Sequence, residues 1–256
     1  PPIGHDIQLL RDNIWATRIE AERAMEEYGQ LVIKVKTVAR AVFDNRYTNA
    51  FFKAVPGLHD WAMLGKAWWH TTEKREDGRP RFDLVLFDAP ATGHALDMLR
   101  VPKVILELVP PGVLRRDAEA AWALFQDGIQ SGVVVVSLPE DMPVTETIEI
   151  VHALEGELHL PVVRLVVNGV IEQLFSRCER ETLIHAEGLL AVEIPHLDPG
   201  DQALAVAAHR AAREALQARC IARLEEELGT QVTLLPFLLD GAGTPGGVRQ
   251  LAAKLT

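Results

Sequence analysis

The sequence predicts an α/β protein whose mostly parallel, doubly wound sheet is flanked by helices on both faces. Residues 84–87 form a continuous apolar run, residues 132–138 form a run rich in valine, and residues 160–167 form a third run of strand length. Continuous apolar runs of this length indicate strands that are covered on both faces, as in parallel sheets. Helical patterns separate these runs, and such alternation of strands and helices is typical of α/β folds.

The composition narrows the class of protein. The chain has 256 residues, enough to bury a sizeable core, and we expect a single domain over residues 1–256. Its 36 acidic and 26 basic residues give a net charge of −10, which argues against a general nucleic-acid binder. No apolar run approaches the roughly 20 residues of a membrane span, and no signal peptide opens the chain. We therefore expect a cytoplasmic protein that is not integral to a membrane.

Further elements follow from hydrophobic spacing, proline and glycine. Pro110, Pro111 and Gly112 end a strongly apolar segment, and Pro143 suits the first turn of a helix. The last long helix is rich in alanine, and we expect its charges on the outer face. The predicted helices cover residues 21–43, 61–69, 117–126, 143–154, 179–188, 203–228 and 249–255, and the predicted strands cover 13–20, 82–88, 132–140, 160–167, 189–195 and 231–237.

Asp88 is the candidate functional residue on which the other site predictions depend. The strand expected over residues 82–88 would place its carboxylate at the carboxyl edge of the sheet, where ligands bind in open α/β folds. Thr92 and Gly93 follow and lead into a helix, an arrangement suited to phosphate and to Mg²⁺ with its water. An aspartate that caps a turn after a strand is an equally good interpretation of the spacing alone.

The segment from Asp88 to Pro102 resembles the switch II segment of ArsA-type ATPases. These are the anion-transporting and tail-anchored-protein-targeting members of the deviant-Walker P-loop group that includes MinD and ParA. Their usual form is Asp-Thr-Ala-Pro-Thr-Gly-His-Thr-Leu, whereas this chain has Asp-Ala-Pro-Ala-Thr-Gly-His-Ala-Leu. The chain departs from that form at residues 89–91 and matches it at Asp88, Thr92, Gly93, His94 and Leu96.

The resemblance implies a P-loop NTPase type of fold and an enzyme that hydrolyses ATP, with ATP or ADP and Mg²⁺ as cofactors. Asp88 would orient Mg²⁺ or its water, and Thr92 and Gly93 would form the catalytic switch backbone that senses the γ-phosphate. Hydrolysis would move a dimer between open and closed states. The dimer would be a homodimer or a heterodimer with a paralogue.

The resemblance also implies an adenine site in the second half of the chain. In P-loop relatives an asparagine after a strand recognises the adenine edge, and Asn168 follows the strand expected over residues 160–167. A side-chain amide suits this role because it offers both a donor and an acceptor. Leu235, Pro236 and Phe237 resemble the loop that covers the adenine. The alternatives are a simple Asn-Gly turn and a simple strand end.

The phosphate-binding loop of this family has no counterpart in the sequence. The pattern Gly-x-x-x-x-Gly-Lys-Ser/Thr is absent, because Lys66 is followed by Ala67 and the glycine cluster over residues 241–247 lacks lysine. We expect that cluster to form a turn. In the family the first strand and the P-loop precede the region that matches here, so these elements either lie upstream of Pro1 or do not exist in this protein.

Residues 101–131 are expected to form a short helical insertion where the targeting relatives carry a long methionine-rich client groove. Met98 is the one methionine nearby, and flexible client grooves use many. The leading hypothesis is an ATPase for protein targeting or for handling membrane-associated partners. The alternatives are a pseudo-ATPase scaffold that pairs with an active paralogue and a client-binding chaperone for tail-anchored membrane proteins. Arsenite transport is not expected, because Cys178 and Cys220 form no Cys-x-x-Cys pair.

Overall fold

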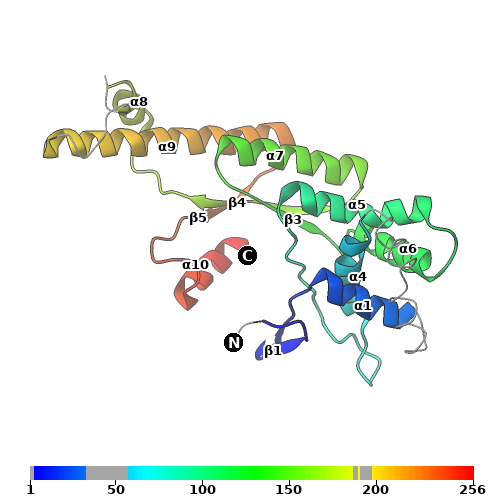
Figure 1. Ribbon diagram of the computed structural model, residues 1–256. Helices are drawn as coiled ribbons and strands as arrows, with labels where there is room; N and C mark the ends of the chain where they lie inside the picture. Colours follow the sequence, from blue (N-terminus) through cyan, green and yellow to red (C-terminus); the bar gives the residue numbers. More distant parts are fainter. Residues whose placement is uncertain (1–2, 33–56, 187–189, 191–197) are drawn as a thin grey trace. The chain divides into compact units, whose positions relative to one another are not determined.

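The computed structural model describes residues 3–32, 57–186, 190 and 198–256 (Figure 1). The chain divides into two compact units, Pro1–Ser131 and Gly132–Thr256. The first unit is mainly helical and begins with a small antiparallel hairpin, whereas the second unit contains the parallel sheet. A single domain over residues 1–256 stays a prediction.

The hairpin of the first unit joins β1 (Gln8–Arg11) to β2 (Ile14–Ala16) in antiparallel register. The turn is tight because Asp12 adopts a left-handed backbone conformation, with φ of 47°. The strand predicted over residues 13–20 is thus confirmed only for its first part, and β1 was not predicted. The hairpin is tied to the start of the chain, since the Thr17 hydroxyl donates to the His5 carbonyl at 2.5 Å.

The described remainder of the first unit contains four helices: α1 (Ala21–Val32), α4 (Leu58–Thr72), α5 (Thr92–Leu108) and α6 (Val113–Gln126). The helix predicted over residues 21–43 is observed as α1, and its remainder lies outside the described residues. The core between these helices contains Trp61 and Ile105, both fully buried. Gly57 adopts φ of 76°, and a Cβ there would lie 2.6 Å from a Val101 methyl group, so this approach of α4 to α5 requires glycine.

The strand predicted over residues 82–88 is wrong in this structure. Residues 84–90 carry no regular secondary structure, and Leu84 and Leu86 are 74% and 85% exposed. A strand is stable only when a neighbour completes its hydrogen-bond ladder. None of the described strands pairs with this segment. The apolar run is therefore extended but uncovered, with Leu84 and Leu86 alternating with the less exposed Val85 and Phe87.

The second unit is built on a parallel sheet in the order β3-β4-β5. Its strands are β3 (Val133–Ser137), β4 (Val162–Val170) and β5 (Thr233–Pro236). Figure 1 shows α7 (Asp141–His152) and α9 (Pro199–Leu228) on one side of the sheet and α10 (Pro245–Leu255) on the other. This arrangement confirms the predicted α/β class, with a parallel sheet flanked by helices.

Helix ends in the second unit follow local capping rules. Pro199 starts α9, and the Asp198 side chain accepts hydrogen bonds from two backbone N–H groups of its first turn. Helix α8 (Arg177–His185) has a complete capping box between Ser176 and Glu179. The turn predicted over residues 241–247 is only partly correct, because Thr244 caps α10 and the last three residues are helical.

Other expectations fall outside these elements. The strand predicted over residues 189–195 lies almost wholly outside the described residues. After α7 the chain continues into a single π-helical turn, Ala153–Glu157, which was not predicted.

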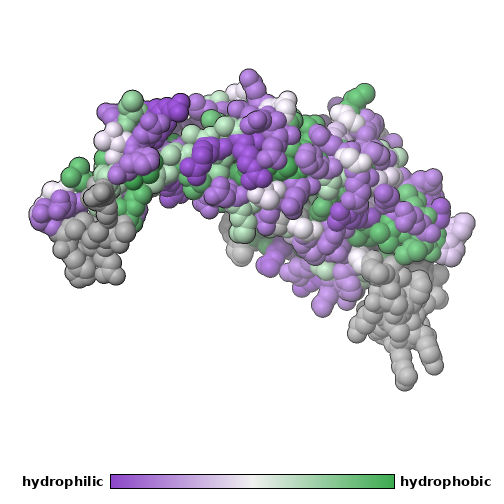
Figure 2. All heavy atoms as spheres, turned by 90° about the horizontal axis from the view of Figure 1, so that it is seen from above, coloured by the Kyte–Doolittle hydropathy of each residue, from purple (hydrophilic) through white to green (hydrophobic). Residues whose placement is uncertain are grey.

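Figure 2 looks onto the side of the second unit that carries α7 and α9, and hydrophilic side chains prevail on their outer surface. No helix in the described part of the chain has the length and apolar character needed to cross a membrane.

Replacing Ile105 in α5 tests the core of the first unit. Ile105→Ala removes a side chain that is 0% exposed, so we expect the free energy of unfolding to fall by about 2–5 kcal/mol. Leu108→Ala, one turn later on the same helix, is the control because Leu108 is 66% exposed. Urea unfolding measures both, and equal losses in the two variants would contradict the assigned core.

Candidate functional site

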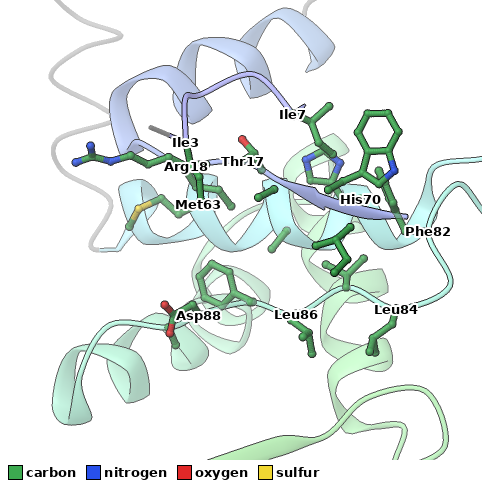
Figure 3. A pocket seen from close by; sticks show the side chains of 18 of the residues that line it. Ile3, Ile7, Thr17, Arg18, Met63, His70, Phe82, Leu84, Leu86 and Asp88 are labelled. Atoms are coloured by element: carbon green, nitrogen blue, oxygen red, sulfur yellow. The ribbon is translucent and has the colours of Figure 1, made fainter. Parts of the chain in front are cut away.

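The first part of the candidate site is a pocket of about 840 Å³ in the first unit. Figure 3 shows its lining side chains, which come from the hairpin, from α4 and from the extended segment that ends at Asp88. Most of this lining is apolar, including Trp15, Met63 and Leu86. Asp88 lies at one end of the pocket and contributes an exposed carboxylate. A charged group is thus placed beside a cavity that is otherwise largely hydrophobic.

The other end of the extended segment is fixed by aromatic and charged contacts. The Phe82 ring packs edge-to-face against Trp15 and His70, with ring centroids 6.5 Å and 6.0 Å away. The Arg81 guanidinium lies 5.0 Å from the Phe82 ring and donates to Glu73 at 3.1 Å. The segment that carries Asp88 is therefore held in place at its start by the contacts of Arg81 and Phe82, near the end of α4.

The residues that follow Asp88 form the start of α5. The helix begins at Thr92, and the preceding Ala91 provides no side-chain cap, so the first N–H groups are available to a ligand. A Cβ added to Gly93 would meet no atom within 4 Å. The absence of a side chain at Gly93 is thus not required by packing and leaves room for a ligand. The Thr92 side chain lies outside the described residues.

The donor set at Asp88 can be compared with the needs of Mg²⁺. In nucleotide sites Mg²⁺ keeps several waters and is held by one or two carboxylates together with phosphate oxygens. A single exposed carboxylate next to a helix N-terminus fits this pattern. Within the described part of the chain, no group of three or more His, Cys, Asp or Glu residues could hold a metal ion alone. The site therefore fits an ion that arrives with a phosphate ligand.

The predicted adenine residues gather at the carboxyl ends of β4 and β5 in the second unit. Val170 pairs with Pro236, and the Phe237 N–H donates to the Val170 carbonyl at 2.8 Å. Asn168 lies within β4, two residues before its end, and its side chain is exposed. Leu235 and Pro236 are half-buried, whereas Phe237 is 55% exposed. The structure thus brings these four residues to one edge of the sheet.

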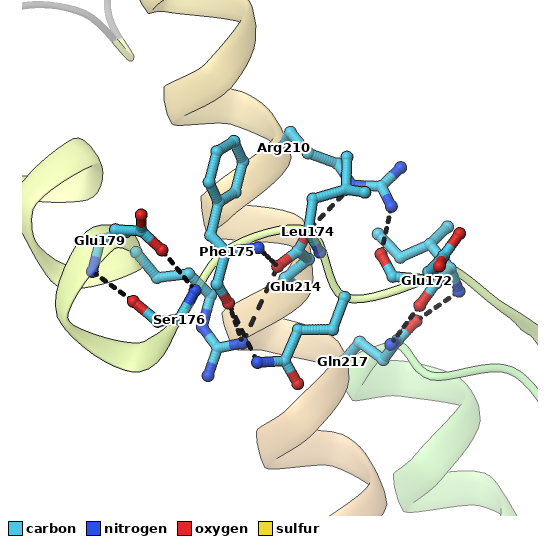
Figure 4. A network of polar contacts seen from close by, with 11 residues as sticks. Glu172, Leu174, Phe175, Ser176, Glu179, Arg210, Glu214 and Gln217 are labelled. Atoms are coloured by element: carbon cyan, nitrogen blue, oxygen red, sulfur yellow. Dashed lines mark hydrogen bonds and ion pairs between the residues drawn. The ribbon is translucent and has the colours of Figure 1, made fainter.

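A buried polar network that was not predicted lies next to this edge (Figure 4). The segment after β4 runs along α9, and three α9 side chains spaced one turn apart bind its backbone. Gln217 binds Ile171, Glu214 binds the N–H groups of Leu174 and Phe175, and the Arg210 guanidinium donates to the Glu172 carbonyl. The expectation that α9 carries its charges on the outer face is thus wrong for Glu214, which is 2% exposed.

Glu214 is ionised in this environment despite its burial. Burial by itself raises the pKa of a carboxyl group, but the N–H groups of Leu174 and Phe175 and the Arg210 guanidinium outweigh this effect. The pKa of Glu214 therefore lies below its ordinary value of 4.5. The Arg180 guanidinium, 3.8 Å from the carboxylate, adds a further positive charge. One signal in the sequence could have indicated this role, namely an acid on the alanine-rich face of α9 beside Ala208 and Ala211.

Glu214 should make stability depend on pH. Because its pKa is lower in the folded chain, its stabilising contribution is present above pH 4.5 and is lost as the pH falls below that value. We expect Glu214→Gln to lower the free energy of unfolding by about 1–3 kcal/mol near pH 7 and by less near pH 3.5. Urea unfolding at both pH values measures this difference. Glu226→Gln, at an exposed position of α9, is the control; an equal loss at both pH values would contradict the assigned ionisation.

Comparisons with known proteins cover the part of the chain that contains Asp88. Residues 2–110 match the family model described as anion-transporting ATPase. ATPase BagA of Mycobacterium tuberculosis is 28% identical over 153 residues, which are 60% of this chain and 44% of that protein. A protein of Halobacterium salinarum named "Putative arsenical pump-driving ATPase" is 26% identical over 192 residues, or 67% of this chain and 28% of that protein.

The chain spans less than half the length of either relative. The family match includes the extended segment, Asp88 and the whole of α5. The resemblance to ArsA-type ATPases is thus confirmed over residues 2–110, which match the family model described as anion-transporting ATPase.

Proposed function

We propose that this chain is part of an ArsA-like ATPase that binds ATP with Mg²⁺ and hydrolyses it. The observation that carries the proposal is the exposed Asp88 carboxylate beside an uncapped helix N-terminus, inside the segment that matches the family. A carboxylate and free N–H groups are the two chemistries that a metal-bound phosphate requires. The names of the relatives, both of which contain the word ATPase, support the same activity.

In the first unit, Asp88 would hold Mg²⁺ or one of its waters, and the N–H groups of Thr92 and Gly93 would bind the terminal phosphate. Bound Mg²⁺ would neutralise charge on the phosphate oxygens during transfer. The protein contributes by placing its charge and dipoles before the reaction starts. The open space at Gly93 supports this role, since phosphate oxygens must approach the backbone closely.

In the second unit, the Asn168 amide would recognise the polar edge of the base, while Leu235, Pro236 and Phe237 would cover its apolar face. An amide matches the adjacent donor and acceptor of adenine. The exposed Phe237 ring suits stacking because an aromatic ring gains contact with a planar base. The shared sheet edge of Asn168 and Pro236 supports their action on one base.

Hydrolysis would switch a homodimer or heterodimer between two conformations in the cytoplasm, for protein targeting or for handling membrane-associated partners. An element that binds the terminal phosphate changes its environment when that phosphate leaves, which is a general basis for such switches. The chaperone alternative has less support, because Val101 and Ile105 of the apolar run are buried in the core rather than lining a groove.

Asp88→Asn tests the proposed phosphate role in the full-length protein. The substitution keeps the size of the side chain but removes the charge that would orient the ion, so we expect ATP turnover to fall by about 100-fold or more. ADP binding and the unfolding temperature should change little, because Asp88 is exposed. Steady-state hydrolysis and calorimetric titration measure the two effects.

Asp83→Asn is the matched control, since Asp83 is an exposed aspartate of the same extended segment. Its turnover should equal that of the unaltered protein. Unchanged hydrolysis in Asp88→Asn would remove Asp88 from the mechanism. An inactive unaltered protein that still pairs with a paralogue would instead favour the scaffold alternative.

Asn168→Ala tests the proposed adenine role. Inosine nucleotides differ from adenine nucleotides at the edge that the amide would bind, so the preference for ADP over IDP should fall about fivefold, the value of one hydrogen bond. Calorimetric titrations with each nucleotide and Mg²⁺ measure this preference. A preference that stays the same would show that Asn168 does not recognise the base.

A further inference from the structure

Helix α9 fixes the backbone that follows the candidate base-recognition residue. We infer that Gln217, Glu214 and Arg210 are positioning residues for nucleotide recognition, because they hold the segment 171–175 against α9 and thereby fix the orientation of Asn168. This inference rests on the proposed adenine role of Asn168. It adds a second layer of residues, on a different element, to the site at the edge of the sheet.

The first step concerns the point where β4 leaves the sheet. The last sheet contact is made by Val170, whose carbonyl accepts from the Phe237 N–H. The next residue, Ile171, is bound at both of its peptide groups by one side chain. Its N–H donates to Gln217 Oε1 at 2.8 Å, and its carbonyl accepts from Gln217 Nε2 at 3.0 Å. The Gln217 amide therefore takes the place of a neighbouring strand for one residue.

The second step concerns the next turn of α9. Glu214 accepts from the N–H groups of Leu174 and Phe175 at 3.0 Å and 3.3 Å. Arg210 holds the carboxylate with its Nε at 3.0 Å and donates from its other end to the Glu172 carbonyl. Charge-assisted hydrogen bonds of this kind are the stronger class in proteins. The segment after β4 is therefore held at several successive residues rather than at one.

The third step connects this contact to Asn168, three residues before Ile171. Gly169 lies between them with φ of 72°, a conformation that glycine adopts freely and leaves freely. The Asn168 side chain is exposed, and within the described residues it has no hydrogen bond of its own. The backbone therefore sets the direction of the Asn168 side chain. That backbone is held by the pairing of β4 with β5 and, just after β4 ends, by the contact of Gln217 with Ile171. Loss of the Gln217 contact would let the flexible glycine link change that direction.

Gln217→Leu in the full-length protein is the direct test. Leucine has a similar size but forms neither hydrogen bond with Ile171, while every proposed nucleotide contact is retained. We expect the preference for ADP over IDP, measured by titration with Mg²⁺ present, to fall about threefold, which approaches the loss in Asn168→Ala. Gln217→Glu, which keeps the acceptor for the Ile171 N–H, should lose less, and it serves as the second variant where Gln217→Leu does not fold.

Arg213→Leu is the matched control, because Arg213 lies on the exposed face of the same helix. Its preference between the two nucleotides should equal that of the unaltered protein. A purely structural role of Gln217 would weaken ADP and IDP binding equally, and that result would overturn the inference. If Asn168→Ala loses the preference and both Gln217 variants keep it, the inference fails and the adenine role stands. If Asn168→Ala also keeps it, both fail.

Discussion

The need of every peptide group for a hydrogen-bond partner governs both units of this chain. In the second unit this need is met inside the sheet by strand pairing, and beyond the sheet by Gln217 and Glu214 of α9. In the first unit the apolar segment 84–90 has no described strand beside it, so its backbone stays extended and its leucines stay exposed. The same requirement thus explains an ordered edge in one unit and an open segment in the other.

This difference also bears on function. Strand pairing and the Gln217 contact hold the carboxyl edge of β4. Such an edge suits a side chain that must point in one direction to distinguish one base from another. The Asp88 segment is anchored at Phe82 and again at α5, with an unpaired stretch between them. A segment with few backbone contacts is more easily moved by a ligand than a strand within a sheet. That property suits an element that would respond to the presence of a terminal phosphate.

Much of the fold could be predicted from local patterns. Three elements have a pattern that is complete within one segment: the valine run of β3, the apolar run of β4 and the alanine-rich stretch of α9. Their structures could therefore be assigned without tertiary information. The segment 84–87 has the same pattern but not the same structure, because strand formation also depends on a neighbour that no local pattern reveals. The β1 strand depends on the left-handed turn at Asp12, which the sequence indicates only weakly.

The candidate site was predictable to a similar extent. Asp88 and Gly93 stand out through their order in the sequence, and Asn168 through its place after an apolar run. Glu214 and Gln217 could not be recognised in this way, because their partners Leu174 and Ile171 lie 40 and 46 residues earlier in the chain. Buried polar groups of this kind are defined by tertiary contacts, and the signal of one acid on an alanine-rich helix face is shared by many helices.

The central proposal has two parts, each within one unit: the Asp88 segment contacts a nucleotide phosphate, and the carboxyl edge of β4 contacts an adenine base. Amide hydrogen exchange of the full-length protein, with and without ADP and Mg²⁺, tests it most directly. Slower exchange on nucleotide addition at residues 88–94 and at residues 168–176 is the predicted result. Unchanged exchange in both segments at saturating nucleotide would contradict the claim.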